Sequence, residues 1–344
     1  MAQPVGDGLT ASDAGIDDPL RDRGDGERHA DRGVAVVLFV VALAALARPV
    51  LEHLFDRPAI AQWATIFVAI AVQAMPFLVL GVSVSAAIAA FVPAGFLPRM
   101  LPSSPVLAVP VAAAAGAALP GCECGSVPIA GRLIARGAPP AAALAFLLSA
   151  PAINPVVLVS TAVAFPGKPE VVGARLLASL LAAIVVGLLW SRFGRDHLLD
   201  PGRRRMHEHE GPHLRVFMLT AQHDLLSAGG FLIIGAGTAA TLQTVVPRSV
   251  LDSVAGTDLV AVLALGLLAV LMAICSEADA FVAASLTQFS LTARLTFMVV
   301  GPMVDVKLIA LQAGTFGRSF AVRFAPMTLL VAVVSSVGVG WWVL

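Results

Sequence analysis

The residues best suited to chemistry lie between positions 120 and 128, where the sequence reads PGCECGSVP. Cys122 and Cys124 place two thiols two residues apart, with the carboxylate of Glu123 between them and the hydroxyl of Ser126 nearby. Thiolates prefer soft ions such as Cu(I), Zn(II) or trivalent arsenic over magnesium or calcium. A free cysteine is also a small apolar packing residue. The segment therefore admits both a metal-binding and a packing interpretation.

A second polar group follows an apolar span in the C-terminal half. Cys275 and Ser276 are followed closely by two carboxylates, Glu277 and Asp279. Carboxylates are rare inside membranes and usually mark ion pathways or proton relays. The alternative is that both lie hydrated at the membrane interface.

A third feature interrupts two long apolar segments. Pro151 and Pro155 lie four residues apart around Asn154, and prolines inside a helix remove backbone hydrogen bonds. Asp305 and Lys307 lie deep in another apolar segment, and residues two apart do not face each other on a regular helix. We therefore expect either a broken helix or partners elsewhere, as a structural ion-pair network or as a solute or proton pathway.

The composition indicates the environment in which these residues act. Of 344 residues, 58% are hydrophobic and 13% are charged, and the mean hydropathy is +0.90. A soluble core could not bury this much apolar surface, whereas roughly 20 apolar residues cross a bilayer as a helix. The formal net charge of zero gives no reason to expect a nucleic-acid partner. The sequence predicts an all-α, polytopic integral membrane protein in the lipid bilayer.

Apolar runs predict about nine or ten transmembrane segments. The nine long runs are 34–51, 62–92, 105–121, 139–165, 170–191, 217–246, 258–275, 291–313 and 322–344; the short ones are 124–137 and 277–289. The predicted organisation is a disordered polar tail (1–32), a first transmembrane helix (33–56), a first repeat (60–192), a cytoplasmic basic and His-rich loop (193–216) and a second repeat (217–344). Whether the two short stretches cross or re-enter the membrane is left open.

The two predicted repeats align with few shifts. Moving the sequence by 151 positions places Cys124 on Cys275, Pro151 on Pro302 and Trp190 on Trp341. These residue types carry the argument, because matches among Ala, Leu and Val arise easily by chance. Five crossings in each repeat would invert one half relative to the other, which is a common transporter plan with the binding site between the halves.

The charged loop predicts the orientation. Six arginines fall within 192–215, and basic loops stay on the cytoplasmic side. An inverted arrangement also places Arg99, Arg136, Arg318 and Arg323 on that side. The run HEHEGPH at 207–213 could hand a metal to the pore, or it could be an ordinary solvated loop.

Three motifs together resemble a bacterial predicted-permease family that includes the organoarsenical (methylarsenite) efflux permeases and proposed copper/zinc exporters. They are the Cys122–Pro128 segment, Arg136–Pro139 and Ala150–Pro155, and the resemblance covers nearly everything after residue 60. It implies a multi-span permease of the bacterial inner membrane, with broken helices around a central pathway. In metal-associated members, the resemblance implies that a cysteine-rich turn at the first motif supplies the ligands.

The sequence therefore predicts a permease that exports a small solute, either a soft metal ion or a trivalent (organo)arsenical, by alternating access. Cys122, Cys124 and Cys275 are the predicted ligands, and Glu277, Asp279 and Asp305 the predicted proton carriers. No cofactor is expected, and a companion membrane or metal-delivery protein is a further expected partner. The alternatives are a permease for an organic or anionic solute and a non-transporting membrane scaffold subunit. Motifs typical of enzymes are missing, so an enzyme is not expected.

Overall fold

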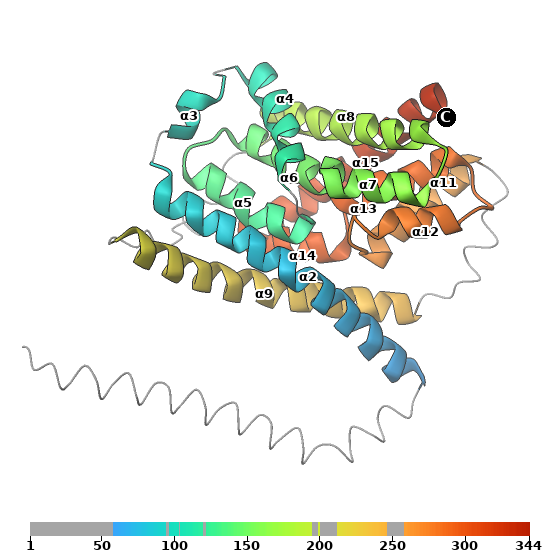
Figure 1. Ribbon diagram of the computed structural model, residues 1–344, viewed down its shortest axis with the longest axis horizontal. Coiled ribbons are helices and arrows are strands. Elements are labelled where there is room, and N and C mark those ends of the chain that lie inside the picture. The colour runs from blue at the N-terminus through green and yellow to red at the C-terminus, as the bar shows by residue number, and fades with distance from the viewer. Residues whose placement is uncertain are drawn as a thin grey trace, which may run out of the picture. The chain divides into compact units, whose positions relative to one another are not determined.

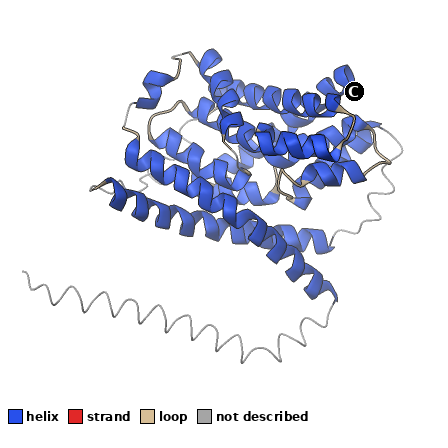
Figure 2. Cartoon of the chain, viewed as in Figure 1, coloured by secondary structure: helices blue, strands red, loops and turns tan. Residues whose placement is uncertain are grey.

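The computed structural model describes residues 58–93, 96–102, 104–119, 122–194, 199, 212–245 and 258–344. All regular elements in these ranges are helices joined by short loops (Figure 2), which confirms the all-α, polytopic prediction. The predicted polar tail (1–32), the predicted first transmembrane helix (33–56) and positions 207–211 of the histidine-rich run lie outside the described residues.

The described helices fall into two halves of the chain (Figure 1). The first half contains α2 (Pro58–Phe91), α3 (Phe96–Met100), α4 (Pro105–Ala115), the 3-10 turn η1 (Gly116–Ala118), α5 (Glu123–Ala135), α6 (Pro140–Ile153), α7 (Pro155–Ala164) and α8 (Pro169–Phe193). The second half contains α9 (His213–Val245), α11 (Asp258–Met272), α12 (Asp279–Ser285), α13 (Leu291–Met303), α14 (Val306–Phe316) and α15 (Arg318–Val343). In the described ranges, six spans are long and apolar enough to cross a membrane, with α6–α7 and α13–α14 each counted as one.

Both of these composite spans are broken in the middle, as the sequence predicts. Asn154 separates α6 from α7, and Pro155 takes the first helical position, where its missing N–H leaves no hydrogen bond unmade. The Oδ1 atom of Asn154 accepts a hydrogen bond from the backbone N–H of Val157 at 3.0 Å. Asp305 has the matching place in the second half, and its Oδ1 accepts from the N–H of Leu308 at 2.5 Å. Both polar residues are therefore N-caps of a half-helix.

α9 runs antiparallel to α2, and the end of α8 lies beside the start of α15. The Nδ1 atom of His213, at the start of α9, lies 2.7 Å from the carbonyl oxygen of Ala90, near the end of α2. The ring of Trp190, near the end of α8, packs against Phe320 and Phe324 at the start of α15, with centroid distances of 5.2 and 5.7 Å. The inverted repeat itself stays a prediction.

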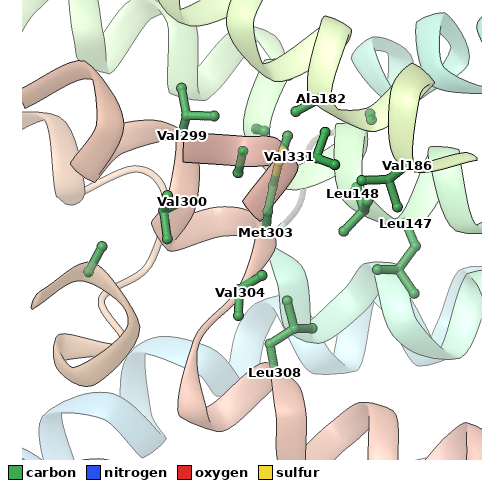
Figure 3. Close-up of a cluster of buried hydrophobic side chains, with 14 of the residues drawn as sticks. Leu147, Leu148, Ala182, Val186, Val299, Val300, Met303, Val304, Leu308 and Val331 are labelled. Carbon is green, nitrogen blue, oxygen red and sulfur yellow. The ribbon is translucent and has the colours of Figure 1, made fainter. Parts of the chain in front are cut away.

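An apolar core fills the contact between the halves (Figure 3). Leu147 and Leu148 from α6 lie near Val186 of α8, and Val300 and Met303 come from α13. All five are at most 1% exposed. The polar residues described below are therefore surrounded by tightly packed hydrocarbon.

Two predicted boundaries are wrong. The loop predicted at 193–216 ends earlier, because α9 already begins at His213, directly after Pro212, and includes Arg215. The span predicted at 105–121 is also shorter, because α4 ends at Ala115 and gives way to the 3-10 turn η1.

The close approach of α2 and α5 gives a first prediction. A Cβ atom added at Gly81 would lie 2.2 Å from the Cα atom of Gly125, which is backbone and cannot move aside. We expect Gly81→Ala to lower the thermal unfolding midpoint of the detergent-purified protein by several degrees. Gly230→Ala on α9 is the control, since an added Cβ there meets no atom within 4 Å. Equal midpoints for the two variants would contradict this packing.

Candidate functional site

The centre of the structure is an ion pair between the two halves. Glu123 is the first residue of α5, and Lys307 lies in the first turn of α14. The Nζ atom of Lys307 pairs with Oε1 of Glu123 and donates to the carbonyl oxygen of Ala273 at 3.2 Å. Both charged side chains are 0% exposed. Each charge therefore depends on the other for compensation.

Asp305 completes this ionic group from the break before α14. Its Oδ1 caps the helix, whereas its Oδ2 lies 3.7 Å from the Nζ of Lys307. Oδ2 has no hydrogen-bond partner among the described residues. Lys307 therefore lies between two carboxylates, one that it engages and one that it could reach.

Two thiols lie beside the Glu123 carboxylate. Sulfur atoms of Cys122 and Cys275 and a carboxylate oxygen of Glu123 lie within 4.8 Å of one another, and all three residues are buried. Cys122 precedes α5 in an extended conformation, and Cys275 lies in the turn after α11. Cys124, also predicted as a ligand, is fully buried but lies outside this group of three.

Strained backbone accompanies the second thiol. Ala273 has a φ of +46°, in the left-handed region that residues other than glycine seldom adopt. Its carbonyl oxygen is the one that accepts from Lys307. Backbone strain of this kind concentrates at functional sites.

A second buried ion pair joins α8 to the start of α12. The Nη2 atom of Arg175 lies 2.7 Å from Oδ2 of Asp279 and 3.2 Å from the carbonyl oxygen of Ser276. Its Nη1 donates to Oγ1 of Thr161 on α7 at 2.8 Å. In the described part of the chain, Oγ of Ser276 and Oδ1 of Asp279 have no hydrogen-bond partner.

A third buried ion pair joins α5 to α9. The Nη2 atom of Arg132 lies 3.0 Å from Oδ2 of Asp224, which also accepts from Oγ of Ser85 at 3.0 Å. Ser85 reaches the carbonyl oxygen of Pro128 as well, at 3.3 Å. This cluster ties α2 and α5 of the first half to α9 of the second.

The remaining predicted residues lie around the breaks. Ser126 is buried, and its hydroxyl donates to the carbonyl oxygen of Glu123 at 3.0 Å. Pro151 is buried within α6, whereas Pro155 is exposed at the start of α7. Glu277 is partly buried, and neither of its carboxylate oxygens finds a hydrogen-bond partner among the residues described.

Sequence reasoning missed three residues of this network: Arg132, Arg175 and Asp224. Each is a charged residue within a predicted apolar segment, which is the same signal that singled out Asp305 and Lys307. Their partners could not be read from sequence, because both pairs join residues about a hundred positions apart.

An all-helical, multi-pass chain with charged residues buried at broken helices has the architecture expected of a membrane permease. The predicted-permease family model matches residues 59–340, so the chain belongs to this family. The "UPF0718 protein YcgR" of Bacillus subtilis (strain 168) is 37% identical over 78% of this chain and 93% of its own length. The "Putative two-component membrane permease complex subunit" of Streptococcus mutans serotype c is 32% identical over 81% of this chain and 95% of its own length. No solved structure matches the chain.

Burial of the central pair gives a second prediction. Lys307→Met leaves two buried carboxylates without their shared cation, and removing one partner of a buried pair costs about 3–5 kcal/mol. We expect the thermal unfolding midpoint in detergent to fall markedly. Lys168→Met changes the other lysine of the chain, which is exposed; it is the control and should leave the midpoint unchanged.

Neutralising the partner should reverse much of this loss. The double variant Glu123→Gln with Lys307→Met removes both charges, so its midpoint should lie closer to that of the unmodified protein. A double variant that is destabilised by the sum of its single changes would show that the two side chains do not interact.

Proposed function

We propose that this permease exports a soft metal ion or a trivalent (organo)arsenical across the bacterial inner membrane. The observation that carries the proposal is the group formed by two buried thiols and one carboxylate, contributed by Cys122, Cys275 and Glu123. The two thiols come from different halves of the chain. A solute held by both would therefore sit between the halves, where transporters of this plan bind their substrates.

The ligand set suits both solute types. Two sulfurs favour a soft ion over magnesium or calcium, and the carboxylate can add a third ligand. A trivalent arsenical with two hydroxyl groups could instead bind both sulfurs, each thiol losing its proton as one water molecule leaves. Cys124 lies two residues from Cys122 and is the nearest further thiol in sequence.

When no solute is present, the Lys307 ammonium neutralises the Glu123 carboxylate. Two unit charges 4 Å apart at an effective dielectric constant of about 20 repel by about 4 kcal/mol. A cation that binds Glu123 must therefore displace the Lys307 ammonium, and Oδ2 of Asp305 at 3.7 Å offers it a second partner. On this proposal, Lys307 shifts between carboxylates as solute enters and leaves, and Asp305, Asp279 and Glu277 are available to carry protons.

The proposed mechanism is alternating access by inverted repeats. The antiparallel packing of α2 on α9 and of α8 on α15 supports it, as do the matching breaks at Asn154 and Asp305. The end of the bundle with Arg136, Arg192 and Arg318 would face the cytoplasm by the positive-inside rule.

A companion protein is part of the proposal. The Streptococcus mutans relative is named as a subunit of a two-component membrane permease complex. A second membrane protein would take up part of the apolar surface of α2 and α9, both of which are largely exposed.

A tolerance assay tests the proposed solute. Cells without their own exporters would express the unmodified chain, Cys122→Ser, Cys275→Ser or Cys124→Ser, and intracellular copper, zinc and arsenic would be measured. We expect one element to fall severalfold with the unmodified chain. The fall should be lost in Cys122→Ser and Cys275→Ser, since each removes one of the two grouped sulfurs, and largely kept in Cys124→Ser.

Membrane levels of each variant serve as the control for expression. If no element changes although the protein reaches the membrane, the soft-metal and arsenical proposal fails, and an organic or anionic solute becomes the better candidate. A fall that survives loss of both Cys122 and Cys275 would remove the thiols from the site.

A further inference from the structure

Three buried ion pairs join the two halves in the described structure, and they lie at different positions along the helices. In each pair, one partner belongs to the first half and the other to the second: Arg132 with Asp224, Glu123 with Lys307, and Arg175 with Asp279. The two halves thus meet through an ion pair at three places, each surrounded by packed apolar side chains.

The Arg132 pair lies on one side of the centre. Arg132 is nine residues along α5 from Glu123, which corresponds to about 14 Å at 1.5 Å per residue. Its partner Asp224 lies in the first half of α9, whose first residue, His213, contacts the end of α2. We call this side the loop end, because α8 ends and α9 begins there.

The Arg175 pair lies on the opposite side. α5 and α6 form a hairpin around Gly137, so α6 and its continuation α7 lead away from the loop end. Thr161, which holds Arg175, is seven residues past the break at Asn154, or about 10 Å. Figure 1 shows α5 on the left and α7 and α12 on the right. We call this second side the far end.

We propose that Arg132–Asp224 and Arg175–Asp279 are the two gates of the permease, on either side of the site at Glu123 and Lys307. Opening towards the loop end separates the first pair while the second stays closed, and opening towards the far end does the reverse. The inference rests on the permease activity proposed above but not on the identity of the solute.

Charge chemistry explains why such pairs suit gates. Each pair holds only while water is excluded, and water that enters an opening vestibule solvates the separated charges. Ser85 contacts Asp224 of one gate and Thr161 contacts Arg175 of the other, so one charge of each separated pair keeps a hydrogen-bonding neighbour. Losing both pairs at once would leave Glu123–Lys307 as the remaining described ion pair across the apolar contact between the halves, which disfavours a continuous channel.

Side-specific labelling of one thiol tests the gates. The chain has three cysteines, so Cys124→Ser with Cys275→Ser leaves Cys122 at the site as the single target. In this background, Arg132→Met with Asp224→Leu removes the loop-end gate, and Arg175→Met with Asp279→Leu removes the far-end gate. Apolar replacement of both partners of a buried pair is often tolerated by the fold. A membrane-impermeant maleimide is then added to right-side-out or inside-out vesicles that contain the full chain.

We expect each gate variant to raise the labelling rate of Cys122 from one face only, and the two variants to act from opposite faces. An increase of about tenfold corresponds to a shift of about 1.4 kcal/mol between conformations. The surface change Glu170→Leu with Arg323→Met is the matched control and should leave both rates unchanged.

Labelling of both gate variants from the same face, or unchanged labelling of folded variants, would overturn the proposal. If a gate variant does not fold, a variant with the two charges exchanged replaces it. The loop-end exchange is Arg132→Asp with Asp224→Arg, and the far-end exchange is Arg175→Asp with Asp279→Arg. These keep both charges, so labelling should match the single-cysteine parent, and increased labelling from either face contradicts a gate made by attraction. The assay needs no solute, so its outcome is separate from that of the tolerance assay.

Discussion

The ion pair between Glu123 and Lys307 is the interaction on which the rest of the structure depends. Both charges are fully buried at the first turns of helices that begin inside the bundle, one from each half. Neither could remain buried alone, because an unpaired charge in an apolar interior is strongly destabilising. The pair therefore requires two broken segments to meet, and this meeting also brings Cys122 next to Cys275.

The two halves contain similar broken helices, but the side chains at the breaks differ. Asn154 and Asp305 both cap half-helices, yet only the second carries a charge that Lys307 can reach. Likewise, Cys124 aligns with Cys275 in sequence, but the thiol that lies beside Cys275 is Cys122. Matched helices give the fold its antiparallel pairs, whereas unmatched side chains make a single asymmetric site between them. Under the proposed mechanism, such a site would bind one solute while the two halves move around it.

The sequence was sufficient for the helices, the breaks and the central residues. Pro151 with Pro155 located one break, and the buried charges of Asp305 and Lys307 located the other, because proline and charge are both incompatible with an uninterrupted apolar helix. The sequence named Cys275 as a third ligand beside Cys122 on the condition that the two breaks meet at the centre, and the structure places these two thiols together. The partners of Arg132 and Arg175 could not be predicted, since they depend on how α9 and α12 pack across the interface. The sequence did not predict that the loop ends at Pro212, because α9 begins with polar residues that precede its apolar stretch.

The central proposal is that a soft solute binds between the halves through two sulfurs, those of Cys122 and Cys275. X-ray absorption at the arsenic edge, on the purified full-length chain loaded with methylarsenite, measures this coordination directly. The account predicts two sulfur neighbours for each bound arsenic, with one sulfur lost in Cys122→Ser and in Cys275→Ser. Arsenic bound only by oxygen, or two sulfurs that remain in both serine variants, would contradict it.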